Sequence, residues 1–375
     1  MSSTGTPQPA GRWTTREIAQ QPDVWRDLAD SLHLQRQRVE EFLAPLLARA
    51  DLRIVLAGAG TSAYAGQIVA PGLARALGRR VDAVATTDLV SNPRDHFTED
   101  VPTLLVSFAR SGDSPESTAA VRLADELLTD CAHLALTCNP DGELYRTLHQ
   151  DGGNSLALLM PSGTNDRGFA MTSSVTCMVL AALVVLGGFG DIASLAAAAT
   201  AALPDLEKQA RALVEGRADR FVYLGSGPLA GVARESALKL VELTAGRVVG
   251  YSDSSLGFRH GPKSVLTDTT LVVVYLSNDP HTRGYDLDIV RELRQSLPAE
   301  RVVPIGCLDV ADEETWSFPA LGHLADVAVA PVLLLAAQHI AVAQSFALGL
   351  DPDNPFPANE VNRVVEGVTI HELDR

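Results

Sequence analysis

The sequence of 375 residues is poor in cysteine and in positive charge. Its four cysteines lie in or beside apolar runs without CxxC spacing, which argues against a disulfide framework and against a zinc site. Its histidines and acidic residues also lack the spacing of metal ligands. The formal net charge of −16 makes nucleic acid and acidic membrane surfaces unsuitable partners. We therefore expect no metal, no redox cofactor, no nucleic acid and no membrane contact.

Apolar runs that would span a membrane are lacking too. Val175–Phe189 is about one helical turn too short, and the longer Ala325–Leu350 is interrupted by Pro331 and by polar residues. We expect both to be buried helices. Because the N-terminus has no charged segment followed by an apolar one, the sequence predicts a cytoplasmic protein.

One stretch near the start predicts an anion-binding site. The apolar run Ile54–Ala57 has the length of a buried strand, and it leads through two glycines, the second being Gly60, into an alanine-rich helix. Backbone N–H groups at such a helix start approach a phosphate closely, and the hydroxyls of Thr61 and Ser62 add donors. A dinucleotide fingerprint would have a third glycine where this chain has Ala63, so a compact phosphomonoester fits better. The alternative is an ordinary strand-to-helix turn.

The rest of the first half alternates strands and helices. Thr14-Thr15-Arg16-Glu17 has the pattern of a capping box and predicts a helix start. Pro115 suits the first turn of a later helix. The expected strands are Val81–Ala85, Thr103–Ala109, His133–Thr137 and Leu156–Leu159, and the expected helices include Pro115–Leu128 and Thr172–Leu186.

The second half repeats the first. Arg220 lies 167 positions after Arg53, and each opens a similar run that ends in Gly-x-Gly. Two further strands match at the same or nearly the same offset, which is hard to obtain by chance. The sequence therefore predicts an α/β protein of two tandem doubly wound parallel-sheet units, flavodoxin-like, with helices on both faces. The matching pairs are Arg53–Gly60 with Arg220–Gly227, Thr103–Phe108 with Thr270–Tyr275, and His133–Thr137 with Arg301–Ile305.

These patterns divide the chain into four parts. Residues 1–12 are rich in Ser, Thr, Gly and Pro and are expected to be disordered. Residues 13–200 hold the N-terminal helices and the first unit, and residues 201–350 hold the second unit. Residues 351–375 form a C-terminal tail that we expect to close the active site.

The two copies differ at the ends of their strands, where ligands of open α/β sheets bind. The second copy has proline and leucine in place of Thr61 and Ser62, and it lacks the pair Arg110-Ser111. Only the first copy therefore keeps a full set of phosphate donors. Serines in turns are also common helix caps, which is the alternative. The predicted phosphate pocket consists of Ser62, Arg110, Ser111 and Ser114 together with the glycine turn.

The second copy carries the candidate catalytic residues. Glu235 and Glu242 lie two turns apart on one face of a helix, with Lys239 between them. For Glu235 we expect an ion-paired, solvated position, whereas Glu242 near the helix end suits a general acid or base. His260, in a loop between glycines and cations, is a candidate for opening a sugar ring. The alternative is that this histidine is structural.

Together these residues resemble the sugar isomerase (SIS) family over roughly residues 40–350. The helix and the histidine loop are similar to the isomerase half of glucosamine-6-phosphate synthase. That resemblance implies that Glu242 moves a proton between C1 and C2 of a sugar and that His260 opens the ring. It also implies a homodimer or homotetramer in which the His260 loop reaches the neighbour's pocket. The motifs that carry it are Gly58–Ser62, Ala109–Ser114, Thr137–Asn139, Thr164-Asn165, Leu238–Glu242 and His260–Pro262.

Two further motifs, Ser107–Ser117 and Asn362–Ile370, resemble the tagatose-6-phosphate ketose/aldose isomerase branch, also described as galactosamine-6-phosphate deaminase/isomerase. This branch implies an enzyme that converts galactosamine 6-phosphate, a small-molecule sugar phosphate, to tagatose 6-phosphate and ammonia. Such an enzyme is classed as a hydrolase of a C–N bond or as an intramolecular oxidoreductase. We also count Thr172 and Ser173, at the start of the long apolar helix, among the substrate-binding residues.

One departure from the synthase family bears on the mechanism. That family has a glutaminase domain, absent here, and a tail lysine that forms an imine with a ketose phosphate, where this chain has Glu366. An aldosamine brings its own nitrogen, so the departure favours deamination or isomerisation over amination. The alternatives are an aldose–ketose isomerase, or a deaminase of another hexose 6-phosphate such as glucosamine 6-phosphate. A sugar-phosphate-binding regulator is disfavoured because the N-terminal helices show no basic recognition helix.

Overall fold

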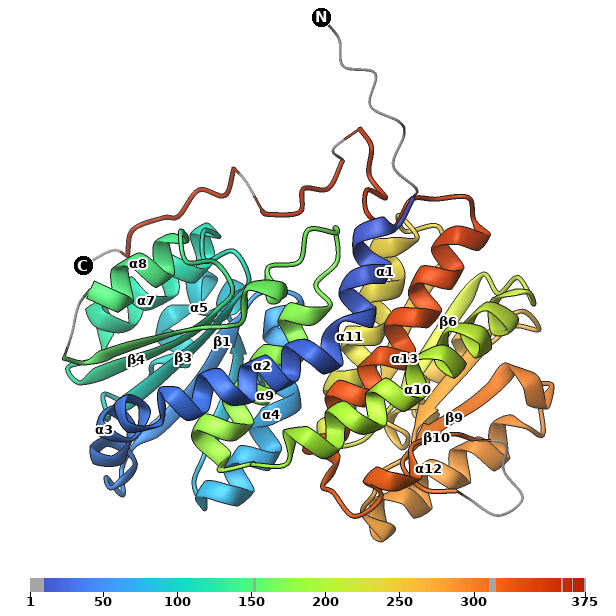
Figure 1. Ribbon diagram of the computed structural model, residues 1–375, viewed down its shortest axis with the longest axis horizontal. Helices are drawn as coiled ribbons and strands as arrows, with labels where there is room; N and C mark the ends of the chain where they lie inside the picture. Colours follow the sequence, from blue (N-terminus) through green and yellow to red (C-terminus); the bar gives the residue numbers. More distant parts are fainter. Residues whose placement is uncertain (1–9, 151–152, 310–314, 359, 366, 374–375) are drawn as a thin grey trace, which may run out of the picture.

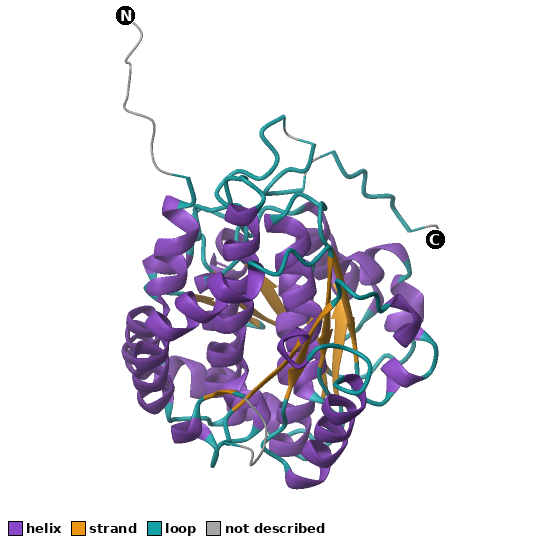
Figure 2. Cartoon of the chain, turned by 90° about the vertical axis from the view of Figure 1, so that its right-hand side faces the viewer, coloured by secondary structure: helices purple, strands orange, loops and turns teal. Residues whose placement is uncertain are grey.

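The computed structural model describes residues 10–150, 153–309, 315–358, 360–365 and 367–373. These residues form two units, each built on its own parallel sheet, with a central layer of helices between the sheets (Figure 1). Seen from the side, the strands are enclosed by helices, as two doubly wound units require (Figure 2). Most of the stretch predicted to be disordered, residues 1–9, lies outside the described residues.

Both sheets have five strands and the same topology. The first has the order β2-β1-β3-β4-β5, and the second has the corresponding order β7-β6-β8-β9-β10. All described strand pairs are parallel, which confirms the predicted fold class. Strands β2 and β3 have the predicted ends. The strands are β1 Arg53–Gly58, β2 Val81–Ala85, β3 Thr103–Ala109, β4 Cys131–Thr137, β5 Ser155–Leu159, β6 Arg220–Leu224, β7 Val249–Asp253, β8 Leu271–Tyr275, β9 Val302–Gly306 and β10 Trp316–Ser317.

The repeat predicted from the sequence is visible in the backbone. Gly60 and Gly227, at the turns after β1 and β6, have nearly identical dihedral angles: φ 54°, ψ −124° and φ 57°, ψ −128°. Such positive φ values favour glycine. A Cβ on Gly58 would come within 2.6 Å of Ser62, and one on Gly225 within 2.3 Å of Leu229. Both turns therefore need glycine at the same two places, because the helix that follows passes close to the strand end.

The two units meet through the helices that follow these turns. Helix α4 (Thr61–Leu77) of the first unit packs against α11 (Pro228–Leu243) of the second. At their crossing, a Cβ on Gly231 would lie 2.9 Å from the backbone nitrogen of Ile68, so only glycine allows this close approach. Nearby, Arg234 donates a hydrogen bond to Gln67 at 2.6 Å. This crossing places the anion loop of one unit beside the candidate catalytic helix of the other.

The N-terminal helix α1 (Arg12–Ala19) begins two residues before the predicted capping box, with Gly11 as its N-cap. The capping-box prediction is wrong because its two key side chains have long-range partners. Thr14 donates to Asp353 at 2.7 Å, and Glu17 accepts the backbone N–H of Arg167 at 2.5 Å. Helix α1 thus connects the C-terminal segment with the loop that precedes α9 (Ser173–Gly187).

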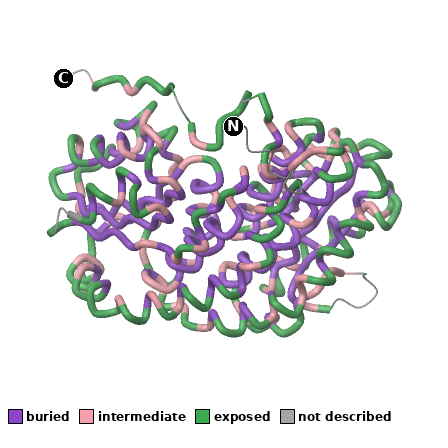
Figure 3. The backbone as a smooth tube through the Cα atoms, turned by 45° about the horizontal axis from the view of Figure 1, so that its top comes forward, coloured by how far each residue is buried: buried purple, intermediate pink, exposed green. Residues whose placement is uncertain are grey.

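The long apolar stretches form core helices, as expected. Helix α13 (Asp326–Ala347) is long and apolar enough to cross a membrane, but 83% of the relevant window is buried inside the protein, and core helices of soluble proteins pass the same test. Figure 3 shows the buried residues gathered in the interior of the molecule. Helix α10 (Ile192–Val214) is unbroken, so the predicted boundary between residues 200 and 201 falls inside a helix. The other α-helices are α2 Gln21–Leu34, α3 Arg36–Leu47, α5 Thr86–Ser91, α6 Pro93–His96, α7 Pro115–Leu127, α8 Glu143–Gln150 and α12 Pro280–Leu293.

Candidate active site

The anion loop lies where β1 ends and α4 begins. Thr61 and Ser62 are the first two residues of α4, and both are buried. The Thr61 hydroxyl donates to Glu235 Oε1 at 3.2 Å, so it connects the loop to α11 of the second unit. In the described part of the chain no side chain or carbonyl accepts a hydrogen bond from the Ser62 hydroxyl. The loop therefore keeps one hydroxyl and its backbone N–H groups for a ligand.

Arg110 and Ser111 follow β3, the neighbouring strand, at the same edge of the sheet. Arg110 is buried, and its guanidinium donates to the carbonyl oxygens of Phe169 at 3.3 Å and Arg363 at 2.9 Å. Arg110 makes no ion pair with a carboxylate within the described residues, which leaves a cation without a counter-ion near the loop. The Arg363 contact also places the C-terminal segment over this edge of the sheet, where Figure 1 shows it crossing the top of the molecule.

The predicted serine and threonine ligands differ in what their hydroxyls contact. Ser111 Oγ accepts the N–H of Asp113 at 3.3 Å, so its own proton stays available. Ser114 caps α7 and contacts the Ser117 hydroxyl at 2.7 Å, which matches the alternative of a helix cap. Thr172 donates to Asp166 at 3.1 Å and Ser173 to the carbonyl of Glu17 at 2.7 Å.

Thr172 and Ser173 are fully buried. Their hydroxyl protons are donated to internal partners, Asp166 and the carbonyl of Glu17. Asp166 also accepts the backbone N–H groups of Thr172 and Ser174 and so caps the start of α9. In this arrangement neither hydroxyl is left to donate to a substrate. Their assignment as substrate ligands remains a prediction, and the structure gives them a role in fixing the loop before α9.

Helix α11 carries a row of three charged residues that runs from the interior to the surface. The exposed fractions of the side chains are 0% for Glu235, 1% for Lys239 and 25% for Glu242. Lys239 Nζ lies 3.5 Å from Glu235 Oε1 and makes a short hydrogen bond to Glu242 Oε2. Only Glu242 is open to a ligand. The expectation that Glu235 is solvated is wrong, because the crossing with α4 covers it.

Burial and mutual attraction decide the charge of this row. Burial raises the pKa of Glu235 to about 7, although the positive charge of Lys239 opposes this shift. Burial lowers the pKa of Lys239, but Glu235 and Glu242 outweigh it and the pKa ends above its ordinary value. Lys239 therefore stays protonated and holds Glu242 by a charge-assisted hydrogen bond. Arg110 is close enough to act electrostatically on Lys239, so the cation of the first unit faces the row of the second.

Lys239 is a site residue that the sequence argument missed. Its spacing from two acidic residues was visible, but the same spacing is common on solvated helix faces. Leu238 and Leu240 on either side were a weak signal that the helix is buried at this point. Only the α4–α11 crossing makes the lysine inaccessible.

His260 lies in a loop of the second unit and not on α11. It follows β7, between the short 3-10 turns η2 (Gly257–Arg259) and η3 (Pro262–Val265), and it is exposed. Within the described residues, no hydrogen bond or ion pair joins His260 to Glu242. Within the described part of one chain, the two predicted catalytic residues are therefore not bonded to each other.

At the corresponding strand ends of the second unit, carboxylates accept the hydrogen bonds of the loop donors. Asp326 accepts the Ser277 hydroxyl at 2.5 Å and the N–H of Asn278 at 2.6 Å. Asp286 accepts the N–H of Ser277 at 3.0 Å and the Ser255 hydroxyl at 2.5 Å. A cavity of about 790 Å³ lies beside Asp326, and its lining carries two carboxylates, Asp279 and Asp326, against the single cation of Arg75. Free phosphate donors are thus a property of the first unit.

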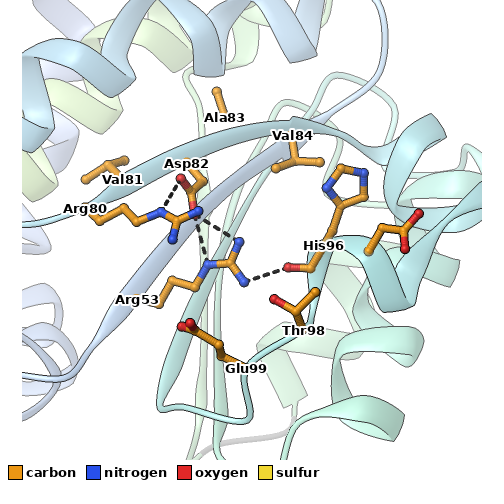
Figure 4. Close-up of a pocket in the computed structure, with 10 residues that line it drawn as sticks. Arg53, Arg80, Val81, Asp82, Ala83, Val84, His96, Thr98 and Glu99 are labelled. Carbon is orange, nitrogen blue, oxygen red and sulfur yellow. Dashed lines mark hydrogen bonds and ion pairs between the residues drawn. The ribbon is translucent and has the colours of Figure 1, made fainter.

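Two other polar groupings lie at the opposite, amino-terminal edge of the first sheet. Figure 4 shows a cavity of about 310 Å³ in which Asp82 pairs with Arg53 at 2.9 Å and Arg80 at 2.8 Å. The possible metal ligands found among the described residues are Asp125, Cys131 and His133, at α7 and the start of β4. Burial raises the pKa of the Cys131 thiol to about 12, so it offers no thiolate at neutral pH. Neither grouping joins the anion loop.

Comparison with known proteins identifies the family of the chain. Residues 46–186 match the family model described as SIS domain. A protein named AgaS from Streptomyces coelicolor is 55% identical over 96% of both chains, and the D-galactosamine-6-phosphate deaminase AgaS of Escherichia coli is 46% identical over 96% of both. The crystal structure of tagatose-6-phosphate ketose/aldose isomerase from Escherichia coli superposes with a TM-score of 0.90 at 43% identity, covering 99% of this chain and 100% of that one.

The chain therefore belongs to the sugar isomerase (SIS) family. Within the family it lies in the branch of the AgaS proteins and of tagatose-6-phosphate ketose/aldose isomerase.

The raised pKa of Glu235 predicts a pH dependence of stability. The folded protein holds a proton on Glu235 up to about pH 7, whereas the unfolded chain releases it near the ordinary value of 4.5. The stabilisation is therefore present below pH 4.5 and is lost as pH rises towards 7. The variant Glu235→Gln should reduce this loss, measured by urea unfolding at pH 5 and pH 8. Part of the pH dependence of stability should remain in this variant, because the pKa of Glu17 is also raised to about 7.

The matched control for this measurement is Glu41→Gln, since Glu41 is exposed on α3. It should keep the wild-type slope. An unchanged slope in Glu235→Gln would contradict the assignment of a buried, protonated Glu235.

Proposed function

We propose that this protein is a D-galactosamine-6-phosphate deaminase that forms tagatose 6-phosphate and ammonia. The observation that carries the proposal is the position of Glu242, which is open at the surface end of a buried charged row whose inner member, Glu235, accepts a hydrogen bond from Thr61 of the anion loop. The names of the AgaS relatives support the amino-sugar substrate, and the name of the similar crystal structure supports the ketose phosphate product.

The substrate phosphate binds at the first unit. The backbone at Gly60, the N-terminus of α4, the Ser62 hydroxyl and the Ser111 hydroxyl supply donors, and the unpaired charge of Arg110 supplies attraction. The C-terminal segment that touches Arg110 then covers the site. This placement leaves the sugar carbons between the anion loop and α11.

The chemistry uses the nitrogen that the substrate carries. His260 opens the ring, and Glu242 takes the proton from C2 of the open-chain aldosamine and returns one to C1. The product is a ketimine at C2, and water hydrolyses it to the ketone and ammonia. Lys239 fixes the Glu242 carboxylate during both transfers through its hydrogen bond.

The lysines of the chain fit a mechanism without a protein-bound imine. There are three: Lys208, Lys239 and Lys263. Lys239 is buried and protonated, and Lys263 pairs with Glu292 at 2.5 Å, so neither is a free amine near Glu242. Glu366, which stands where the synthase has its lysine, lies outside the described residues.

Two alternatives use the same site. An aldose–ketose isomerase would need Glu242 but would release no ammonia, and a glucosamine-6-phosphate deaminase would differ only in the recognition of the C4 hydroxyl. A sugar-phosphate-binding regulator would have no use for a buried Glu235–Lys239–Glu242 row, which costs desolvation. We also propose a cytoplasmic location, because its substrate and product are phosphorylated metabolites.

A substrate panel tests the proposal. Galactosamine 6-phosphate, glucosamine 6-phosphate and their N-acetylated forms are incubated with the enzyme, and ammonia and ketose phosphate are measured together. We expect equal amounts of ammonia and tagatose 6-phosphate from galactosamine 6-phosphate, and no reaction of the N-acetylated forms, whose amide nitrogen cannot leave as ammonia. Ketose without ammonia would favour the isomerase. Binding without any product would favour the regulator.

We further propose a homodimer or homotetramer in which His260 serves the neighbour's site. Its exposure, and the lack of a hydrogen bond or ion pair to Glu242 within the described residues of one chain, support this arrangement. A two-fold interface would bring both His260 loops to both sites at once.

Subunit mixing tests this assembly. A Glu242→Gln protein and a His260→Ala protein, each with strongly reduced but measurable activity, are dissociated and allowed to reassociate in equal amounts. Half of the dimers are then mixed, and each mixed dimer has one intact site, so activity should recover to roughly a quarter of wild type. No recovery would place His260 in the site of its own chain.

A further inference from the structure

We propose that Glu292 on α12 positions the His260 loop for catalysis, an inference that rests on the proposed role of His260. Glu292 lies 32 positions from His260 in the sequence, and no sequence pattern connects them. In the structure its carboxylate joins the residue before His260 and the residue three places after it.

The loop is anchored before the histidine by the fully buried Phe258, but the part that follows has no such anchor. His260 ends the turn η2, and Gly261 has φ 116°, a value that glycine adopts without strain and other residues avoid. Pro262 then opens η3. The imidazole is exposed, and no described residue makes a hydrogen bond to it. A side chain outside the loop is therefore needed to restrict the position of His260.

Glu292 supplies that restriction through both carboxylate oxygens. Oε2 accepts from Arg259 Nε at 2.7 Å, and Oε1 accepts from Lys263 Nζ at 2.5 Å. The three side chains are 27%, 34% and 34% exposed for Arg259, Lys263 and Glu292, so the pairs are partly shielded from water. A carboxylate that binds both ends of a short loop holds it more firmly than a single surface ion pair does.

The anchor itself is rigid. Helix α12 packs on the second sheet through Ile289, Val290 and Leu293, all of which are buried. Glu292 lies between two of these core positions, so the position of its backbone is fixed by packing. The hydrogen bonds from Lys263 and Arg259 lower the pKa of Glu292, which keeps the carboxylate charged throughout the neutral range.

Without Glu292 the two cations would repel each other and the loop would move. A group displaced by about 1 Å from its working geometry can cost on the order of 100-fold in rate. Because Glu292 touches neither the anion loop nor α11, its loss should affect turnover and leave substrate affinity unchanged.

The test compares Glu292→Gln, Glu292→Asp and the control Asp288→Asn. Asp288 lies one turn earlier on α12 and pairs only with exposed Arg291 at 3.4 Å, so it matches Glu292 in charge and helix but not in partners. We expect Glu292→Gln to lower kcat by roughly 10- to 100-fold with KM and the inhibition constant of inorganic phosphate unchanged. Glu292→Asp should recover part of the loss, and Asp288→Asn should behave like wild type.

A double variant tests whether Glu292 acts through the histidine. In the His260→Ala background, Glu292→Gln should cause no further loss, because the group that it positions is already missing. Equal losses in both backgrounds, or a raised KM with unchanged kcat, would overturn the proposal.

Hydrogen exchange of residues 257–265 gives a readout that needs no substrate. Exchange should quicken in Glu292→Gln and stay at the wild-type rate in Asp288→Asn, with the unfolding midpoint unchanged. Unchanged exchange in Glu292→Gln would contradict the inference whatever the substrate proves to be. Failure of the proposed function shows separately, as a wild-type protein that turns over none of the amino-sugar phosphates.

Discussion

The buried ammonium of Lys239 is the interaction on which the site depends. A charge that is almost fully removed from water is tolerated only when it is paired, and Glu242 provides the counter-charge on the same helix, with Glu235 3.5 Å away on the inner side. The third contact of the row comes from the other unit, where the Thr61 hydroxyl reaches Glu235. A continuous row of contacts therefore connects the anion loop, through Glu235 and Lys239, to Glu242, the carboxylate of the row that a substrate can reach.

A duplicated fold explains why the parts of the site are spread over two units. Gly60 and Gly227 keep the same backbone, and α4 crosses α11 so closely that Gly231 has no room for a side chain. The side chains at the strand ends differ. In the first unit hydrogen-bond donors stay open to a ligand, whereas in the second unit Asp286 and Asp326 accept the hydrogen bonds of the corresponding donors. The first unit thus provides the anion-binding groups, and the second unit provides the acid–base groups.

Local patterns in the sequence were enough to predict the repeat, the parallel sheets and the ends of β2 and β3, because apolar runs and glycine turns depend on neighbouring residues. The burial of Glu235 was not predictable, since it results from a helix crossing between residues more than 150 positions apart. The same reason applies to Ser173, whose hydroxyl donates to the carbonyl of Glu17, whereas the partner of Thr172 is the nearby Asp166. The ion pairs of Glu292 with Arg259 and Lys263 beside His260 also come from packing between distant residues, which residue order does not reveal.

The most direct test of this account is the exchange of the substrate hydrogen at C2 with solvent deuterium. Wild-type enzyme should incorporate deuterium from heavy water at C1 of the product, because the proton abstracted from C2 passes through Glu242 before one is returned. The variant Glu242→Gln should bind the sugar phosphate with unchanged affinity, lose about 10²–10⁴ in kcat and incorporate no deuterium. A Glu242→Gln protein that still exchanges this hydrogen would contradict the assignment of Glu242 and the account built on it.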